Sequence, residues 1–446
     1  MIKRYAGLWL LILALLVPMS AGAATSTGKY VPLPSLLIFT QHTETRELGN
    51  KLDDRRTYPD TANERVNEAV AAMVDRLADE ADGHLPARGR DSTVWADTGA
   101  SVTVTGTKTA SFLVLSHILQ DKEQTWVGFE TAVYDLKNGR KKTLSDFFTE
   151  EAGEIIRREI VTQLNAYFPE KEADQALLLE MAEQYRSAPF TLSPAYLILH
   201  YRADALYGEK QSLMHVRVPY QALKPYMTVL ALSETDNARY LVAAPTFDDG
   251  PGRGVTNGIL LLLREKCAGA TFFNLGQLLR PSKDYILWEH DAGYSVQSHT
   301  FSHTVGIKDA DLMYKERDKF ARYQIELIGI PPAYMRAPGG VDGLYCKYDI
   351  GMPVIRWNTL TSDASKEVDI NSWLGTFGYT LKDTSVILMH NIRWSSVEMA
   401  TQVLTRLQSK GYLTCTVDEL FLIRGIELEK NVVYFGDEAD QEEAQP

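Results

Sequence analysis

The first half of the chain keeps helical and strand patterns in separate runs. Residues 58–81, "YPDTANERVNEAVAAMVDRLADEA", place apolar side chains at helical spacing, and a second helical pattern covers residues 151–168. Alternating stretches typical of antiparallel strands lie at residues 101–106, 110–119 and 126–136, and a last group of strands lies at residues 190–202 and 212–223. This arrangement predicts an α+β domain.

The second half alternates strand and helix patterns along its whole length. Strand patterns occupy residues 240–247, 270–275, 294–299, 333–338, 353–358, 385–391 and 413–417. Helical patterns lie between them at residues 256–267, 284–293, 311–329, 371–381 and 399–411. Such alternation predicts an α/β fold with a parallel sheet, either closed as a barrel or open with helices on both faces. In both architectures, sites are built from polar residues just past the strand ends.

A polar stretch separates the two halves. "LSETDNAR", at residues 232–239, interrupts the apolar pattern. We expect it to mark a boundary between two separately packed cores. A chain starting near Ser233 is therefore expected to fold by itself.

The overall charge narrows the class of partner. The 446 residues carry a net charge of -12 at pH 7, whereas nucleic-acid binding depends on Lys and Arg neutralising phosphates. No nucleic-acid partner is therefore expected. Cys267, Cys346 and Cys415 are odd in number and lack metal-ligand spacing, so they are interpreted as buried thiols.

The first residues predict an export signal. Basic residues at 3–4 precede an apolar run at residues 8–17, and small residues at 21–23 offer a cleavage site. The run is shorter than the roughly 20 residues that span a bilayer, although an uncleaved anchor stays as the alternative. We expect a signal peptide at residues 1–23, a secreted or cell-envelope location, and no membrane contact beyond that peptide.

Polar residues that could bind a metal or transfer protons follow several predicted strands. An open metal site commonly takes three protein ligands, and mixed histidine and carboxylate ligands suit zinc and its neighbours. Each residue alone has an ordinary explanation, because Asp-Asp-Gly forms turns and a buried arginine pairs with any acid. Their joint placement at successive strand ends indicates a metal site, with one aspartate and two histidines as fitting ligands. The residues are Asp248, Asp249, His299, His303, Arg336, Asp363 and His390.

Five short motifs, in this order and spacing, resemble those of the polysaccharide deacetylase family (NodB homology, carbohydrate esterase 4). They are "TFDDGPG" at 246–252, "ATFFNLG" at 270–276, "HTFSH" at 299–303, "RAPGG" at 336–340 and "ILMHN" at 387–391. The resemblance covers residues 240–424. It implies a distorted (β/α) barrel and metal-dependent removal of N-acetyl groups from sugar polymers such as peptidoglycan or chitin, or of O-acetyl groups in some members.

The same resemblance assigns the metal ligands and the base. Asp249, His299 and His303 would bind Zn²⁺ or another divalent ion such as Co²⁺, Ni²⁺ or Mn²⁺. Asp248 would stay free as the catalytic base, because its neighbour gives its charge to the metal. Arg336 would pair with Asp248 and keep it ionised.

The resemblance also assigns the acid and the oxyanion donor. His390 would protonate the departing amine, and Asp363 would hold that imidazole in its charged form. The backbone N–H of Gly339 would bind the oxyanion. Trp394 has two open roles, sugar stacking near His390 and the commoner one of core packing.

Four positions depart from the family pattern and leave the substrate preference least secure. Thr304 stands where the family often has proline, and Gly339 replaces a common aromatic residue. Leu360 and Ala364 occupy positions often held by an acid and by a tryptophan that walls the groove.

The first half has a resemblance of its own. "NGRKKTLSDFF" and "VRVPYQALKPYM" resemble domains of unknown function that precede the catalytic domain in some bacterial cell-wall deacetylases. We expect an α+β domain at residues 32–232 with one or two subdomains, a catalytic domain at 240–424 and an acidic tail at 425–446.

Together the two resemblances imply an exported N-deacetylase for polymers containing N-acetylglucosamine, with cell-wall peptidoglycan favoured and chitooligosaccharides next. Two alternatives stay open. One is an O-acetyl esterase acting on a xylan-like polysaccharide, and the other is a catalytically silent sugar-binding protein.

Overall fold

The computed structural model describes residues 30–47, 52–86, 94–208, 212–364, 381–436 and 438–440. The predicted signal peptide and most of the predicted helix at 371–381 lie outside these ranges. Within them, no helix is both long and apolar enough to cross a bilayer. The three cysteines are free; Cys415 is buried, and Cys267 and Cys346 are half-buried.

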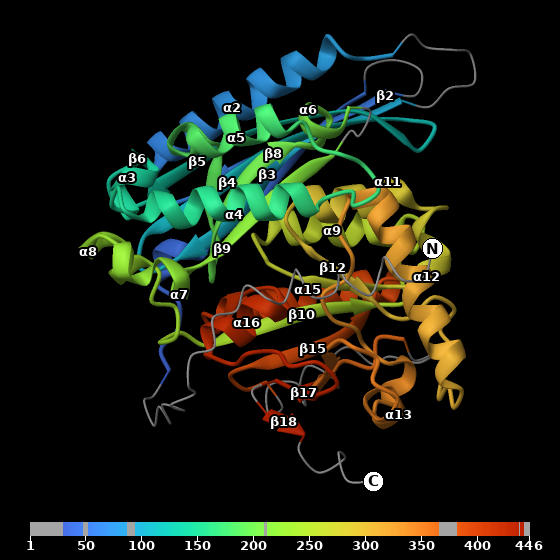
Figure 1. Ribbon diagram of the computed structural model, residues 1–446. Helices are drawn as coiled ribbons and strands as arrows, with labels where there is room; N and C mark the ends of the chain where they lie inside the picture. Colours follow the sequence, from blue (N-terminus) through green and yellow to red (C-terminus); the bar gives the residue numbers. More distant parts are fainter. Residues whose placement is uncertain are drawn as a thin grey trace.

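A six-stranded sheet dominates the first half, with its strands in sequence order. All neighbours are antiparallel except β2 and β3, which run parallel because helix α2 (Glu64–Asp82) crosses between them. Figure 1 shows α2 on the outer side of this sheet. The strands are β1 (Thr40–Glu47), β2 (Leu52–Asp60), β3 (Val94–Thr105), β4 (Thr109–Gln120), β5 (Glu123–Asp135) and β6 (Arg140–Lys142).

A smaller antiparallel sheet, in the order β7-β8-β9, follows in the same half. Its strands are β7 (Phe190–Leu192), β8 (Tyr196–Arg202) and β9 (Leu213–Pro219). The helices around it are α3 (Leu144–Phe147), α4 (Ala152–Ala166), α5 (Gln175–Glu183), α6 (Ala203–Tyr207), α7 (Tyr220–Leu223) and α8 (Val229–Glu234). The predicted mixture of helices and strands in this half is confirmed.

Three strands of the first half, β1, β2 and the three-residue β6, were not predicted. β1 and β2 have mostly polar sequences, "TQHTETRE" and "LDDRRTYPD", so neither shows an apolar face. The helix predicted from residue 58 instead begins at Glu64, after Asn63 caps it by accepting the N–H of Val66.

The second half holds a parallel sheet in the order β12-β11-β10-β15-β14, with β16 paired to β10. Its strands are β10 (Val242–Asp248), β11 (Thr271–Asn274), β12 (Ser295–Ser298), β13 (Val354–Arg356), β14 (Thr359–Leu360), β15 (Ser385–His390) and β16 (Leu413–Thr414). Its helices are α9 (Val255–Glu265), α10 (Gly276–Leu279), α11 (Lys283–Asp291), α12 (Ala310–Ile328), α13 (Gly343–Lys347), α15 (Trp394–Ser409) and α16 (Val417–Ile423). The predicted α/β class is confirmed.

The hydrogen-bonded path of this sheet continues beyond β12. Met335 forms isolated parallel bridges with Ser298 and with Val354 of β13, and β14 starts three residues after β13 ends. The link from β13 to β14 is made by the chain itself, and β14 then pairs with β15. The strand predicted at 333–338 is reduced to these bridges, since the prolines around it cannot donate to a ladder.

Part of the predicted acidic tail belongs to the fold instead. β17 (Val433–Phe435) pairs with β13 and with β18 (Glu438–Asp440), and Val433 and Tyr434 are buried. The apolar run "VVYF" at residues 432–435 explains why this segment packs.

The two halves share their apolar cores through β4. Phe112 and Val114 cluster with the buried face of α2, whereas Leu113 and Leu115 cluster with apolar side chains of β10, α9 and α11, among them Trp288. Successive strand residues face opposite sides, so both faces of β4 are buried. The expectation of two separately packed cores is therefore wrong.

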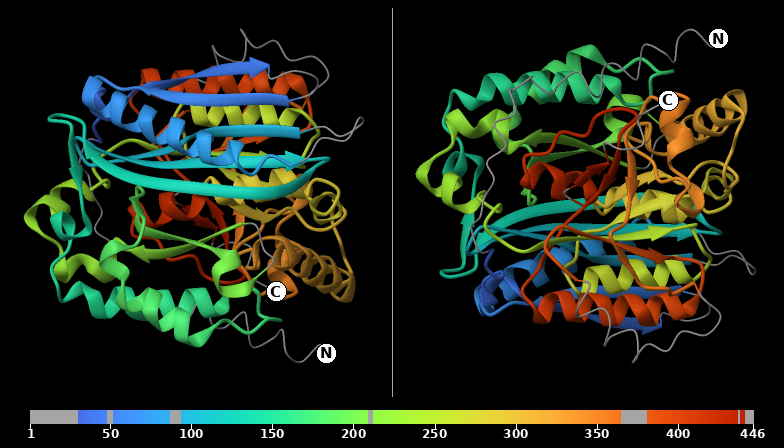
Figure 2. Two further views of the ribbon diagram at one scale, coloured as in Figure 1. Left: turned by 90° about the horizontal axis from the view of Figure 1, so that it is seen from above. Right: turned by 90° about the horizontal axis from the view of Figure 1, so that it is seen from below.

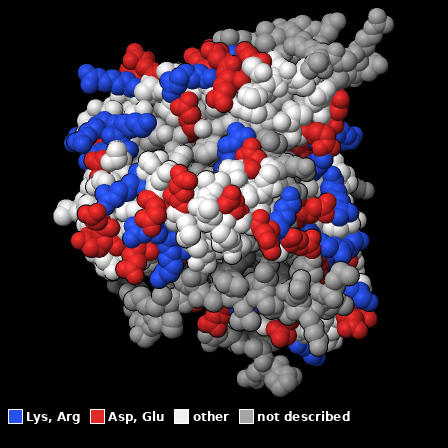
Figure 3. Space-filling model, turned by 45° about the horizontal axis from the view of Figure 1, so that its top comes forward, with Lys and Arg blue, Asp and Glu red and all other residues white. Residues whose placement is uncertain are grey.

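Polar contacts also join the halves. Arg264 of α9 places Nη2 2.5 Å from Oδ2 of Asp97 in β3, and both side chains are almost fully buried. Gln41 donates to the carbonyl oxygens of Ala100 and Arg264. Figure 2 shows α15 beside β1 at one edge of the molecule. On the face in Figure 3, basic and acidic side chains are interspersed rather than separated.

Candidate active site

The predicted chemical residues gather at one edge of the parallel sheet. Asp248 ends β10 and His390 ends β15, and the two residues are register partners in adjacent parallel strands. His299 directly follows β12, the second strand from β10 on the other side. Because parallel strands end together, their last residues share one edge.

Asp249, His299 and His303 form the candidate metal triad, with one ligand atom from each lying within 4.8 Å of the others. Oδ1 of Asp249 is 3.1 Å from Nε2 of His303 and 3.4 Å from Nε2 of His299. Nδ1 of His299 lies 2.9 Å from the carbonyl oxygen of Arg336, which can only accept. That hydrogen bond leaves Nε2 as the ligand atom.

The electrostatics of the triad fit a cation. Oδ1 of Asp249 is buried without a hydrogen-bond donor, although two imidazole nitrogens converge on it. Burial works against its charge, yet the two imidazoles hold the pKa of Asp249 well below its ordinary value. Asp249 and His303 both have positive φ, 71° and 61°, which is uncommon for non-glycine residues and concentrates at functional sites. The donor set suits zinc and similar divalent ions.

Arg336 holds Asp248 from behind the site. Its side chain is fully buried, and Nη1 donates to Oδ1 of Asp248 and to Oγ1 of Thr246, each at 2.7 Å. Nε donates to the carbonyl oxygen of Ile355, and the guanidinium lies 4.1 Å from the ring centroid of Phe273. One oxygen of Asp248 is therefore occupied by the arginine.

The other oxygen of Asp248 faces the triad. Oδ2 lies 3.8 Å from Nε2 of His299. A carboxylate fixed by an arginine on one side and open toward the candidate metal position on the other can take a proton from a water there.

His390 and Asp363 form a second coupled pair. Nδ1 of His390 lies 2.9 Å from Oδ1 of Asp363, and the backbone N–H of His390 donates to Oδ2 at 2.8 Å. Burial opposes both charges, but their mutual attraction raises the pKa of His390 and lowers the pKa of Asp363. The pair thus favours the imidazolium form of His390, which can donate from Nε2.

Two hydroxyl groups complete these pairs and were missed from the sequence. Thr246 accepts from Arg336, and Thr361 donates to Asp363 at 3.0 Å. Each lies two residues before the aspartate of its pair. Thr246 and Asp248 share a face of β10, and that spacing was the available signal, whereas Thr361 and Asp363 lie just after β14 and offered no such signal.

Gly339 lies in a short 3-10 turn (Pro338–Gly340) with φ of 66°. A Cβ there would lie 3.3 Å from Cγ1 of Val305, so both backbone and space favour glycine. Its placement among the strand-end loops agrees with the prediction, while its role stays a prediction.

Trp394 is 63% exposed, so core packing is wrong for it. It begins α15 four residues after His390, and its ring lies beside Gly254 and Gly258 of the neighbouring loop and helix. Cβ atoms added there would lie 3.6 and 3.3 Å from the ring. The two glycines therefore let the ring of Trp394 approach the start of α9 closely. Leu360 is also exposed, at 51%.

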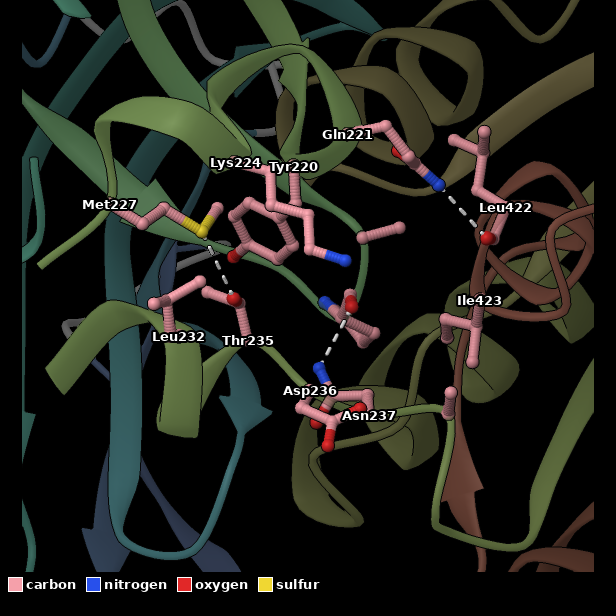
Figure 4. A pocket seen from close by; sticks show the side chains of 13 residues that line it. Tyr220, Gln221, Lys224, Met227, Leu232, Thr235, Asp236, Asn237, Leu422 and Ile423 are labelled. Carbon is pink, nitrogen blue, oxygen red and sulfur yellow. Dashed lines mark hydrogen bonds between the residues drawn. The ribbon is translucent and has the colours of Figure 1, made fainter. Parts of the chain in front are cut away.

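A cavity of about 380 Å³ lies elsewhere, between α7, α8 and α16 (Figure 4). In it the side chain of Gln221 donates to the carbonyl oxygen of Leu422, which joins the two halves. None of the predicted site residues lines this cavity.

Comparison with known proteins supports the resemblance of the second half to the deacetylase family. The family model described as "Polysaccharide deacetylase" matches residues 236–346. The chain is 32% identical over 180 residues to peptidoglycan-N-acetylglucosamine deacetylase PgdA of Listeria monocytogenes, covering 40% of this chain and 38% of that protein. The chain thus spans less than half the length of that relative.

A second relative reaches into the first half. The chain is 26% identical over 328 residues to peptidoglycan-N-acetylmuramic acid deacetylase PdaC of Bacillus subtilis, covering 65% of this chain and 68% of that protein. A solved structure, "T48 deacetylase with substrate", covers 44% of the chain at 31% identity with a TM-score of 0.40. The family match and the two relatives confirm the resemblance of the second half to the polysaccharide deacetylase family.

Proposed function

We propose that the protein is an exported, metal-dependent deacetylase that removes N-acetyl groups from polymers containing N-acetylglucosamine, with peptidoglycan as the favoured substrate. The observation that carries the proposal is the meeting of three parts at one sheet edge. These are the triad of Asp249, His299 and His303, the base held by Arg336, and the imidazolium held by Asp363. The relatives named as peptidoglycan deacetylases support the choice of polymer.

The triad would hold a divalent ion such as Zn²⁺, Co²⁺, Ni²⁺ or Mn²⁺. When bound, such an ion supplies Lewis acidity for the acetyl carbonyl and for water. His299 is oriented for this by its hydrogen bond to the carbonyl oxygen of Arg336. Asp249 brings the one negative charge of the ligand set.

Asp248 and His390 would move the protons. Asp248 takes a proton from the attacking water, and Arg336 fixes the orientation of its carboxylate through Oδ1. His390 gives a proton from Nε2 to the departing amine, because Asp363 favours the charged form of the ring. The N–H of Gly339 would donate to the developing oxyanion, a contact worth about 3 kcal/mol when well placed.

Trp394 would support the sugar chain beside this machinery. Aromatic rings present a large apolar surface at low entropic cost, and the exposed ring of Trp394 lies just beyond His390. It would take the place of the tryptophan that often lines the substrate groove in the family and that is Ala364 here.

Acetate release by the purified protein tests the proposal. Peptidoglycan, chitooligosaccharides and acetylated xylan would be compared, each after chelation and again after adding Zn²⁺, Co²⁺, Ni²⁺ or Mn²⁺. We expect metal-dependent release from peptidoglycan and from chitooligosaccharides. Release from xylan alone would indicate the O-acetyl esterase, and binding without any release would indicate the silent sugar-binding protein.

A further inference from the structure

A second cavity, of about 400 Å³, opens where the first half meets the loop that follows Asp249. Lys122 lines it from the tip of the β4–β5 hairpin, and Arg253 and Gly254 line it from the loop. The start of α11 closes it with Ser282, Asp284 and Tyr285. Neither half forms this cavity alone.

The hairpin tip is fixed against the second half. Glu123, next to Lys122, pairs with Lys283 of α11, and the side chain of Gln124 donates to Asp291 at 3.2 Å. These contacts hold Lys122 at the cavity. A free turn would not hold it there.

Lys122 also has an unusual backbone conformation. Asp121 and Lys122 have φ of 50° and 72°, as a two-residue type I′ hairpin turn requires. Such positions favour Gly, Asn and Asp, so a lysine here is held against local preference. Strain of this kind is concentrated at functional sites.

The cavity has a surplus of positive charge. Neither Lys122 nor Arg253 forms an ion pair with a carboxylate in the described parts of the chain, and both are exposed. Asp284 is the acid of the lining, and burial raises its pKa, with Arg253 acting in the opposite direction. The hydroxyl of Tyr285 accepts the N–H of Gly254 at 3.3 Å, which leaves its hydrogen for a ligand. Two cations and a hydroxyl donor suit an anion.

The cavity adjoins the active site. Arg253 lies four residues after Asp249, so their Cα atoms are at most about 14 Å apart. Gly254 borders the cavity and also lies against the ring of Trp394. A sugar chain resting on that ring would therefore carry its next units toward the cavity.

We propose that Lys122 and Arg253 form a binding site for a carboxylate carried by the glycan substrate. The inference rests on the proposed function and names its substrate class more closely. Muramic acid units of peptidoglycan bear a lactyl carboxyl, either free or extended by a peptide with its own carboxylates, whereas chitooligosaccharides are neutral. The first half thus takes part in substrate selection by supplying Lys122.

Lys122→Asn and Arg253→Ala test the site, with Lys137→Ala as the control. Asparagine removes the charge and suits positive φ, so the folded turn is expected to persist. Lys137 is an exposed lysine just beyond the other end of β5, away from the cavity. Acetate release would be measured on three soluble substrates of equal sugar number. They are chitotetraose, a peptide-free tetrasaccharide of alternating glucosamine and muramic acid units, and the same tetrasaccharide with peptides.

For each cavity variant we expect KM to rise about tenfold on the carboxylated substrates, the usual effect of one lost charge-assisted hydrogen bond. On chitotetraose, KM and kcat should stay at the wild-type values, as should all values for Lys137→Ala. A rise with the peptide-free tetrasaccharide identifies the lactyl carboxylate, and a rise only with the peptide form identifies the peptide. Equal effects on chitotetraose and the carboxylated substrates, or no effect on any, would overturn the proposal.

Calorimetric binding keeps the site testable if the deacetylase proposal fails. The peptide-free and peptide-bearing tetrasaccharides would be titrated into wild type, Lys122→Asn and Lys122→Arg. Weaker binding by Lys122→Asn with recovery in Lys122→Arg supports the site even where no acetate is released. Identical binding of both tetrasaccharides by all three proteins contradicts it.

Discussion

The molecule holds two buried arginine–aspartate pairs that differ in what surrounds the second carboxylate oxygen. At the active edge, Arg336 binds Oδ1 of Asp248, and Oδ2 faces His299 at 3.8 Å. Between the halves, Arg264 binds Oδ2 of Asp97, and Oδ1 faces a second arginine, Arg55, at 3.4 Å.

The comparison shows that burial of an ion pair does not identify a site. Burial opposes the charge of Asp97, but Arg264 and Arg55 surround it and hold its pKa below the ordinary value. Both oxygens of that carboxylate face arginine side chains between the two halves. Asp248 keeps one oxygen open toward the metal triad. The Asp248–Arg336 pair can therefore take part in catalysis, whereas the Asp97–Arg264 pair only stabilises the fold.

The largest expected effect comes from removing the first half. A chain starting near Ser233 would expose the surface around Trp288 that Leu113 and Leu115 cover, and would leave Arg264 without Asp97. We now expect it to be insoluble or to lack a cooperative thermal transition. A soluble truncated protein with a sharp transition near that of the full chain would show that the shared core is dispensable.

Asp97→Ala should cost the full chain about 3–5 kcal/mol of unfolding free energy, because it leaves buried arginine charge uncompensated. Turnover per folded molecule should stay unchanged, since Asp97 lies away from the strand ends. Denaturant unfolding and acetate release on the same preparation would check both expectations. A large loss of turnover in folded Asp97→Ala would make the second pair part of the site.

Replacing both partners sharpens the distinction. Asp97→Leu combined with Arg264→Met should return the unfolding free energy to within about 2 kcal/mol of wild type, because apolar residues can substitute for a buried ion pair. Arg55 can stay, since it rests 4.0 Å from the ring centroid of Trp95. The matched control, Asp248→Leu with Arg336→Met, should abolish acetate release even where the protein folds. Failure of the first double variant to recover stability would mean that Asp97 and Arg264 hold more than each other.

The smallest expected effect concerns pH. His390 must be protonated to act as an acid, so activity is present below its pKa and is lost as pH rises through it. Asp363 raises that pKa against the effect of burial. Asp363→Asn should therefore move the alkaline limb of the kcat/KM profile to lower pH by about one unit. A limb at the wild-type position would place the proton donor elsewhere, and His390→Ala should remove the limb altogether.

The sequence predicted the sheet edge that carries the candidate active site better than it predicted the contact between the two halves. Strand ends are visible in the pattern, so the placement of Asp248, His299 and His390 at one edge followed from the parallel sheet. The apolar run of β4 predicted an antiparallel strand, and the structure buries both of its faces. The apolar run did not indicate which distant segment would cover the second face.

Polar contacts between the two halves were still harder to predict from the sequence. Asp97 and Arg264 are 167 positions apart, and neither follows a motif. The position of Trp394 was equally hard to predict. Its exposed ring lies beside Gly254 and Gly258, where there is no side chain to displace it.

The central claim is that two adjacent aspartates have different tasks, metal binding for Asp249 and proton transfer for Asp248. The most direct test measures bound metal and acetate release together in Asp248→Asn and Asp249→Asn. We expect Asp248→Asn to keep stoichiometric metal while turnover falls by about two to four powers of ten. Asp249→Asn should lose metal affinity and turnover together. Loss of metal in Asp248→Asn, or unchanged metal affinity in Asp249→Asn, would contradict the account.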